Sequence, residues 1–196
     1  MNDSVHPVKA PIRVLAISGS LRRASINTAA LEALARLAPR GVSVLVYRGL
    51  GELPPFNPDD DVDDEPKPEP VETFRQLVGA SDAIVIAAPE YAHGLPGALK
   101  NALDWLVASE TFPGKRVVLI STSPRAFHAQ ANLREILGTM AARLMPEAFA
   151  TLPVGARTVS VEDVLKDATC ARRLKESLDA LIGALQEARA APGANS

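Results

Sequence analysis

The sequence predicts a doubly wound α/β fold, in which a five-stranded parallel sheet carries helices on both faces. Short apolar runs rich in β-branched residues alternate along the chain with segments whose apolar residues recur at helical spacing. Such alternation is typical of parallel sheets covered by helices. The chain has 196 residues, 47% of them hydrophobic, so it can bury the core of one domain. We expect residues 12–190 to form this domain, between tails at 1–11 and 191–196.

Five segments have the composition of strands. The first, IRVLAI, is apolar and β-branched and stops at Ser18-Gly19-Ser20, as a buried parallel strand ending in a loop does. The fifth is the weakest of the set. The expected strands cover 12–17, 42–47, 83–88, 117–120 and 149–153.

Helical periodicity appears between these strands and after the last of them. The first helix has Ser25 or Asn27 as its candidate N-cap and Pro39 as its stop. The last is amphipathic, with leucine or isoleucine at positions 174, 178, 181, 182 and 185. The expected helices cover 30–38, 71–78, 95–107, 132–142 and 174–185.

Residues 53–70 (LPPFNPDDDVDDEPKPEP) are rich in proline and aspartate. Such a segment buries little apolar surface, which favours a solvated loop over an acidic binding tract.

Charge and composition exclude several classes of function. Lysine and arginine total 21 against 23 acidic residues, so the charge footprint of a nucleic-acid binder is missing. The single cysteine, Cys170, offers no internal disulfide or metal cluster, and it is expected to pack in a helix. The first dozen residues lack the apolar core of a signal peptide, and no run of about 18 apolar residues suggests a membrane span. We therefore expect a cytoplasmic protein with no metal site and no membrane or nucleic-acid partner.

The loop after the first strand has the chemistry of a phosphate site. Its sequence, SGSLRRASIN over 18–27, gathers hydroxyls, two guanidinium groups and an amide at the entrance of a helix. Helix N-termini present free amides to anions, and hydroxyls and arginine complete the anion shell. The P-loop and GxGxxG patterns are absent, so triphosphate and dinucleotide sites are not supported. The alternative is a serine-rich turn with an ordinary helix cap.

The loop after the third strand, with the helix that follows it, reads PEYAHGLPGALKNALDW over 89–105. Taken with SGSLRRASIN, this stretch resembles the signature of the NADPH-dependent FMN reductase family. The resemblance implies a flavodoxin-like fold, bound FMN and assembly as a homodimer or homotetramer. It also implies electron transfer from NADPH or NADH to a small-molecule acceptor such as a quinone, a flavin, an azo dye or a metal oxyanion.

The resemblance also implies which residues contact the cofactor. Hydroxyls, a guanidinium and backbone amides of the first loop would hold the FMN phosphate, and the third-strand loop would lie against the isoalloxazine ring. Two serines after the fourth strand are further candidate ligands. Residues expected at the phosphate are Ser18, Ser20, Arg22, Ser25, Ile26 and Asn27; at the ring, Pro89, Glu90, Tyr91, Ala92 and His93; and, after the fourth strand, Ser121 and Ser123.

Several residues near the ring depart from the family pattern or have side chains with further candidate roles. Many relatives carry Asn-Tyr where this chain has Ala92-His93, so ring contacts are expected to depend on backbone groups. His93 is a candidate proton donor to a reduced quinone, or else a hydrogen-bonding lid residue. Arg125 is expected to meet a phosphate of the nicotinamide cofactor or an anionic acceptor. Asn101 and Trp105 are expected in helix packing or a subunit interface.

Two other functions are possible alternatives to the reductase, and the sequence argues against both. An FMN-binding electron carrier or flavin sensor would bind FMN without efficient NAD(P)H turnover, but flavodoxin carriers usually have a threonine-rich phosphate loop and pronounced acidity. A serine hydrolase using Ser18 or Ser20 would need a GxSxG elbow and triad partners, which the sequence lacks.

Overall fold

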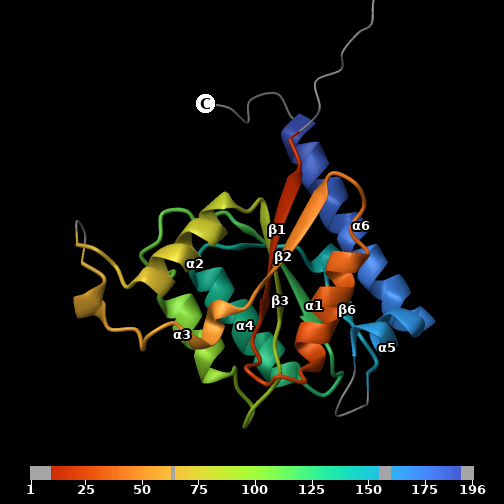
Figure 1. Ribbon diagram of the computed structural model, residues 1–196, viewed down its shortest axis with the longest axis horizontal. Helices are drawn as coiled ribbons and strands as arrows, with labels where there is room; N and C mark the ends of the chain where they lie inside the picture. The colour runs from red at the N-terminus through yellow and green to blue at the C-terminus, as the bar shows by residue number, and fades with distance from the viewer. Residues whose placement is uncertain (1–9, 63–64, 155–159, 191–196) are drawn as a thin grey trace, which may run out of the picture.

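The computed structural model describes residues 10–62, 65–154 and 160–190. Four strands form the body of a parallel sheet in the order β2-β1-β3-β4 (Figure 1). Of the predicted tails at 1–11 and 191–196, residues 1–9 and 191–196 lie outside the described residues. The four strands are β1 (Ile12–Ser18), β2 (Val42–Tyr47), β3 (Ala83–Ala87) and β4 (Arg116–Ser121). Together with the flanking helices described below, this order confirms the predicted doubly wound parallel fold.

The fifth position of the sheet is divided between two short strands. β5 (Arg143–Leu144) pairs with the start of β4, and β6 (Ala150–Thr151) pairs with its end. Between them, Pro146 opens the 3₁₀ turn η3 (Pro146–Ala148). Proline has no amide hydrogen to donate to the ladder, so the chain leaves β4 and returns to it. The predicted fifth strand over 149–153 is thus correct only at its centre.

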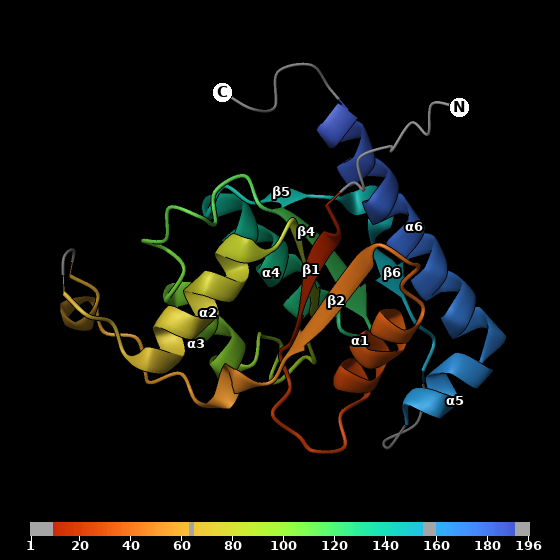
Figure 2. The same cartoon turned by 45° about the horizontal axis from the view of Figure 1, so that its top comes forward.

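Helices cover both faces of the sheet (Figures 1 and 2). Alternate strand residues face opposite layers: Val14 and Ala16 belong to one core cluster, and Leu15 and Ile17 to the other. One face carries α1 (Ile26–Arg36), α5 (Val161–Lys166) and α6 (Ala168–Ala190). The other carries α2 (Glu69–Ala80), α3 (Gly97–Asp104) and α4 (Phe127–Thr139).

Several predicted helices have different bounds: the one predicted over 30–38 covers Ile26–Arg36, and the one predicted over 174–185 covers Ala168–Ala190. The helix predicted over 95–107 is shorter, because Leu95 precedes a proline, which disfavours helical backbone, and the chain turns after Asp104. The helix predicted over 132–142 begins five residues earlier, at Phe127, and ends at Thr139. There Ala141 adopts a left-handed φ of 59°, and the Ala142 amide donates to the Leu137 carbonyl at 2.9 Å.

The long helix α6 confirms the periodicity of the predicted last helix, since its five expected apolar positions are all buried. Cys170 is also buried in this helix, and burial together with the charge of Asp167 raises the pKa of its thiol to about 11. Near the other end, Arg189 donates to the Asp82 carboxylate at 2.9 Å and to the Ala10 carbonyl at 2.7 Å. Within the described residues, none of the helices has the length and apolarity needed to cross a membrane.

The acidic, proline-rich segment is held at defined points. The Asn101 side chain accepts from the Phe56 amide at 2.7 Å and donates to the Pro54 carbonyl at 2.9 Å. Trp105 Nε1 donates to the same carbonyl at 2.8 Å. Arg75 pairs with Asp61, whose side chain is 4% exposed. Asn101 and Trp105 therefore serve packing, as predicted, and the segment is less free than the prediction of a solvated loop implies.

Candidate functional site

Three loops meet at the carboxyl edge of the sheet. They follow β1, β3 and β4, and the chain changes direction between β1 and β3, where doubly wound folds bind ligands. A cavity of about 390 Å³, here called the central cavity, lies among them. Its lining comes from all three loops and includes Ile26, Asn27, Ala88, Pro89, Glu90, Thr122, Ser123, Arg125 and Ala126.

The loop after β1 is fixed by its own hydroxyls. Thr28 Oγ1 donates to Ser18 Oγ at 2.8 Å, and Ser25 Oγ caps α1 by accepting from the Thr28 amide at 3.3 Å. Ser25, rather than Asn27, is therefore the N-cap. Gly19 lies so close to its neighbours that a Cβ there would be 3.0 Å from both Ala88 Cβ and Leu99 Cδ2.

The first amides of α1 point out of the helix without an intrahelical acceptor, as they do at every helix N-terminus. The amides of Ile26 and Asn27 have no acceptor among the described residues. These two residues line the central cavity. Two backbone amides at the entrance of α1 can therefore donate into the central cavity.

Five of the six expected phosphate residues are divided between two cavities, and Ser25 lines neither of them. Ser18, Ser20 and Arg22 line a second cavity of about 410 Å³ between the β1 loop and the end of β2. Tyr47 lines it too, and burial, with a contribution from Glu52, raises the pKa of its hydroxyl to about 12. The tyrosine is therefore a neutral wall at physiological pH.

One buried hydrogen bond joins the first and third of the site loops. Thr122 Oγ1 donates to Asn27 Oδ1 at 2.9 Å, and both side chains are buried. The Oδ1 atom of Asn27 is thereby engaged within the protein. Thr122 was missed in the sequence, although it stands between the two predicted serines of the β4 loop.

The predicted ring loop forms a tight two-residue turn. Tyr91 and Gly94 exchange backbone hydrogen bonds of 3.1 and 2.9 Å, and the residues between them, Ala92 and His93, have φ of 48° and 61°. The His93 ring stacks on His128 of α4 with centroids 4.4 Å apart. Tyr91, Ala92 and His93 are exposed and are not among the residues that line the central cavity.

Glu90 connects this loop to α4. Its Oε2 accepts from the Ala129 amide at 2.9 Å in the first turn of α4, a helix whose own N-cap, Ala126, supplies no side-chain hydrogen bond. A carboxylate also interacts favourably with the positive end of the helix dipole. Glu90 is therefore a helix cap in addition to a cavity residue.

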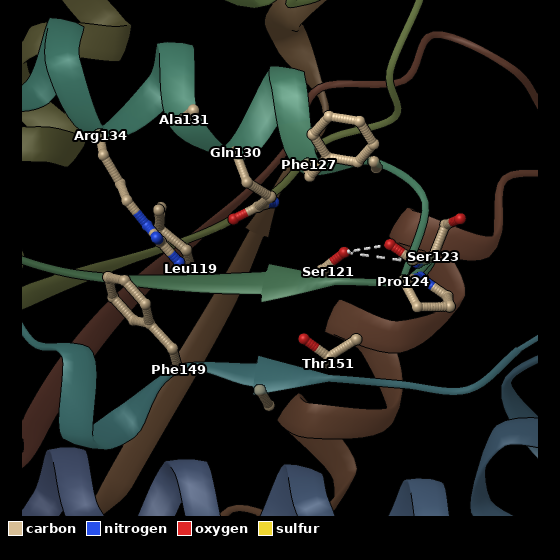
Figure 3. Close-up of a pocket in the computed structure, with 12 residues that line it drawn as sticks. Leu119, Ser121, Ser123, Pro124, Phe127, Gln130, Ala131, Arg134, Phe149 and Thr151 are labelled. Atoms are coloured by element: carbon tan, nitrogen blue, oxygen red, sulfur yellow. Dashed lines mark hydrogen bonds between the residues drawn. The ribbon is translucent and has the colours of Figure 1, made fainter.

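The loop after β4 is stabilised by its serines. Ser121 Oγ donates to the Ser123 carbonyl at 2.8 Å, and Ser123 Oγ accepts from the Arg125 amide at 3.3 Å. Ser123 lines the central cavity, whereas Ser121 faces a different groove beside α4 (Figure 3). Arg125 is exposed and lines the central cavity.

Comparison with known proteins is consistent with this geometry. The sequence profile of the NADPH-dependent FMN reductase family matches residues 12–156. An NAD(P)H-dependent FMN reductase of Pseudomonas aeruginosa is 39% identical over 131 residues, which cover 64% of this chain and 69% of that protein. A quinone reductase of Pseudomonas putida is 36% identical over 146 residues, covering 69% and 76% of the two chains.

A solved structure extends the similarity to almost the whole fold. The flavoenzyme NAD(P)H:(acceptor) oxidoreductase FerB of Paracoccus denitrificans aligns with a TM-score of 0.77 and 28% identity, covering 90% of this chain and 98% of that one. The sheet order, the two loop motifs at its carboxyl edge and the profile match agree with one another. The chain belongs to the NADPH-dependent FMN reductase family.

Proposed function

We propose that this chain binds FMN at the central cavity and works as an NAD(P)H-dependent reductase of quinones or related small-molecule acceptors. The observation that carries the proposal is the convergence of three loops on one cavity, locked by the buried hydrogen bond between Asn27 and Thr122. Membership in the FMN reductase family and the reductase names of the relatives support it. The family membership and these names favour a reductase over an electron carrier.

The phosphate of FMN fits the entrance of α1. The free amides of Ile26 and Asn27 suit phosphate oxygens. Ser20 and Arg22 belong to the same loop but line the second cavity, so their side chains would turn toward the central cavity to contact the phosphate. Gly19 leaves no room for a side chain against Ala88 and Leu99, so it keeps the loop close to the end of β3. The side chains of Ser18 and Ser25 are engaged within the loop and would shape the site more than contact the ligand.

The isoalloxazine ring requires a wall and a few polar groups at its edge. Pro89 and Glu90 on one side and Ser123 on the other line the cavity where that ring would lie. Bound FMN would supply the redox chemistry, accepting hydride from NADPH or NADH and giving two electrons to the acceptor. The protein's part is to anchor and orient the ligands and to leave one ring face accessible.

Two side chains at the rim have proposed roles toward the substrates. Arg125 is exposed beside the cavity, where it would attract a phosphate of NADPH or an anionic acceptor. His93 stays a candidate proton donor, and its stacking on His128 would position its ring. Residues 12–190 would act as one domain, as a homodimer or homotetramer, in the cytoplasm.

Visible absorption of the purified protein tests the reductase directly. Protein supplied with FMN should retain it through gel filtration, lose its flavin band on anaerobic addition of NADPH, and regain the band when a quinone is added. Retention of FMN without bleaching by NADPH or NADH would favour the carrier, and failure to retain FMN would refute the assignment of the cavity.

A charge-matched pair of variants tests the phosphate assignment. Arg22→Ala should weaken FMN binding at least tenfold, because a charge-assisted hydrogen bond contributes about 1.5–3 kcal/mol. Riboflavin, which lacks the phosphate, should bind this variant and the wild type equally. Arg40→Ala, at an exposed site beyond the end of α1, is the control and should leave both affinities unchanged. An equal loss for FMN and riboflavin would place Arg22 away from the phosphate.

A further inference from the structure

A groove separate from the central cavity runs between α4 and the divided edge of the sheet. Its volume is about 330 Å³, within the roughly 300–1,000 Å³ range of small-molecule sites. The groove exists because only β6 covers the end of β4, while η3 carries the chain away from the sheet. It shares Ser123 and Ala126 with the central cavity, so the β4–α4 loop is the wall between the two.

One face of α4 points into this groove. Phe127, Gln130, Ala131 and Arg134 lie at i, i+3, i+4 and i+7, a single helical stripe. Figure 3 shows Gln130 and Arg134 extending from α4 toward β4. The opposite, core-facing stripe carries Leu133 and Leu137. The small Ala131 at the centre of the groove stripe leaves the space that a larger residue would fill.

The far wall of the groove is apolar and aromatic. Leu119 of β4 forms its floor, and Phe149 extends from the chain just before β6 (Figure 3). The guanidinium of Arg134 lies over the Phe149 ring, 5.2 Å from its centroid. This cation–π contact holds the charge of Arg134 beside an apolar surface.

Gln130 adds an unsatisfied donor to the same groove. Its Nε2 is buried and has no hydrogen-bond partner among the described residues. Buried amide donors are nearly always paired, so this unpaired donor in a groove-lining residue is available to an acceptor on a ligand. Gln130 and Arg134 are one helical turn apart, which allows both to reach the same anionic group.

We infer that this groove binds a small aromatic carboxylate, with the carboxylate held by Arg134 and Gln130 and the ring lying against Phe149 and Leu119. A carboxylate matches the guanidinium fork and accepts from the amide as well. A planar apolar body suits a wall made of a phenyl ring and a leucine. The inference does not depend on the proposed flavin chemistry, because none of these four residues lines the central cavity.

Calorimetric titration of the FMN-saturated protein with 2-naphthoate tests the site. We expect saturable one-to-one binding that leaves the visible spectrum of bound FMN in place. The uncharged analogue 2-naphthylmethanol should bind at least tenfold more weakly, because it lacks the charge that Arg134 recognises.

Three variants make the test specific. Arg134→Gln should weaken 2-naphthoate at least tenfold, and Ala131→Leu should do the same by filling the groove without altering charge. Both positions are exposed, so both variants should fold, as circular dichroism would verify. Arg172→Gln on α6, across the sheet, removes an equal charge and should leave binding unchanged.

Several results would overturn the inference. They are the absence of saturable binding, release of FMN by 2-naphthoate, and an equal loss in Arg134→Gln and Arg172→Gln. Release of FMN would place the carboxylate in the central cavity. Equal losses would indicate only a general effect of charge.

Discussion

Replacing Ala92 by glycine should stabilise the protein. Ala92 has a φ of 48° in the turn between Tyr91 and Gly94, and its side chain is exposed. An L-residue in the left-handed region costs roughly 1–2 kcal/mol, a penalty that glycine does not have. The greater freedom of glycine in the unfolded chain offsets about 0.4–1 kcal/mol of this. The net gain should be about 0.5–1 kcal/mol.

Thermal unfolding of the FMN-free protein is the suitable assay. For a domain of this size, 1 kcal/mol shifts Tm by roughly 2–4 °C, so Ala92→Gly should raise Tm by about 1–4 °C. The same substitution at Ala131, exposed in the middle of α4, provides the matched control. There glycine should cost about 1 kcal/mol and lower Tm, because helical backbone favours alanine.

The signs of the Tm shifts of Ala92→Gly and Ala131→Gly show whether the backbone at Ala92 is left-handed. Opposite signs would confirm that the backbone of the ring loop is left-handed at this position. If Ala92→Gly lowers Tm as Ala131→Gly does, the turn is not left-handed in solution, and the account of this loop is wrong.

Three further changes test other parts of the structure. Gly19→Ala brings a Cβ to 3.0 Å from Ala88 and Leu99, so it should displace the β1 loop and weaken FMN binding at least tenfold in equilibrium dialysis. A destabilisation of about 1–3 kcal/mol from overpacking should accompany the change. Unchanged affinity for FMN would contradict the close approach. Asp61→Ala leaves the partly buried Arg75 unpaired and should cost about 2 kcal/mol in urea unfolding, whereas a change near zero would show that the loop is not held there. Burial alone would raise the pKa of Asp82, but hydrogen bonds from the Arg13 amide and the Arg189 guanidinium outweigh it and lower the pKa. The resulting stability is present above the ordinary carboxyl pKa of about 4 and is lost as the pH falls through the lowered folded value. The Tm deficit of Asp82→Asn at pH 7 should therefore shrink in acid, and a deficit that persists there would exclude this linkage.

Local sequence patterns predicted most of the fold. Buried parallel strands are continuous apolar runs, and the amphipathic stripe of α6 has one period along its length, so both are visible in short windows of sequence. The start of α4 was not predictable in this way. Its cap is Glu90, 39 residues upstream of Ala129, whose amide it accepts from, so no residue near Phe127 signals the helix start.

The site residues show the same division between local and long-range causes. The motif around Ser25 predicted the capped entrance of α1, because capping chemistry acts over three residues. Arg22 and Asn27 line two different cavities, and between β1 and these residues Gly19 packs against Ala88 and Leu99, which are distant in the sequence. The hydrogen bond between Thr122 and Asn27 joins residues 95 positions apart, so no local sequence pattern predicts it.

These long-range hydrogen bonds connect loops to one another and not strands to strands. The sheet ladder would persist without Asn27–Thr122 or Glu90–Ala129, since neither pair belongs to it. The two bonds instead fix the distance between the loops after β1 and β4, and between the β3 loop and α4. A planar cofactor between such loops binds more tightly when the gap is set in advance, because ordering of the loops then costs little on binding. The polar pairs at this edge of the sheet are thus better explained by the preorganisation of a ligand site than by the stability of the fold.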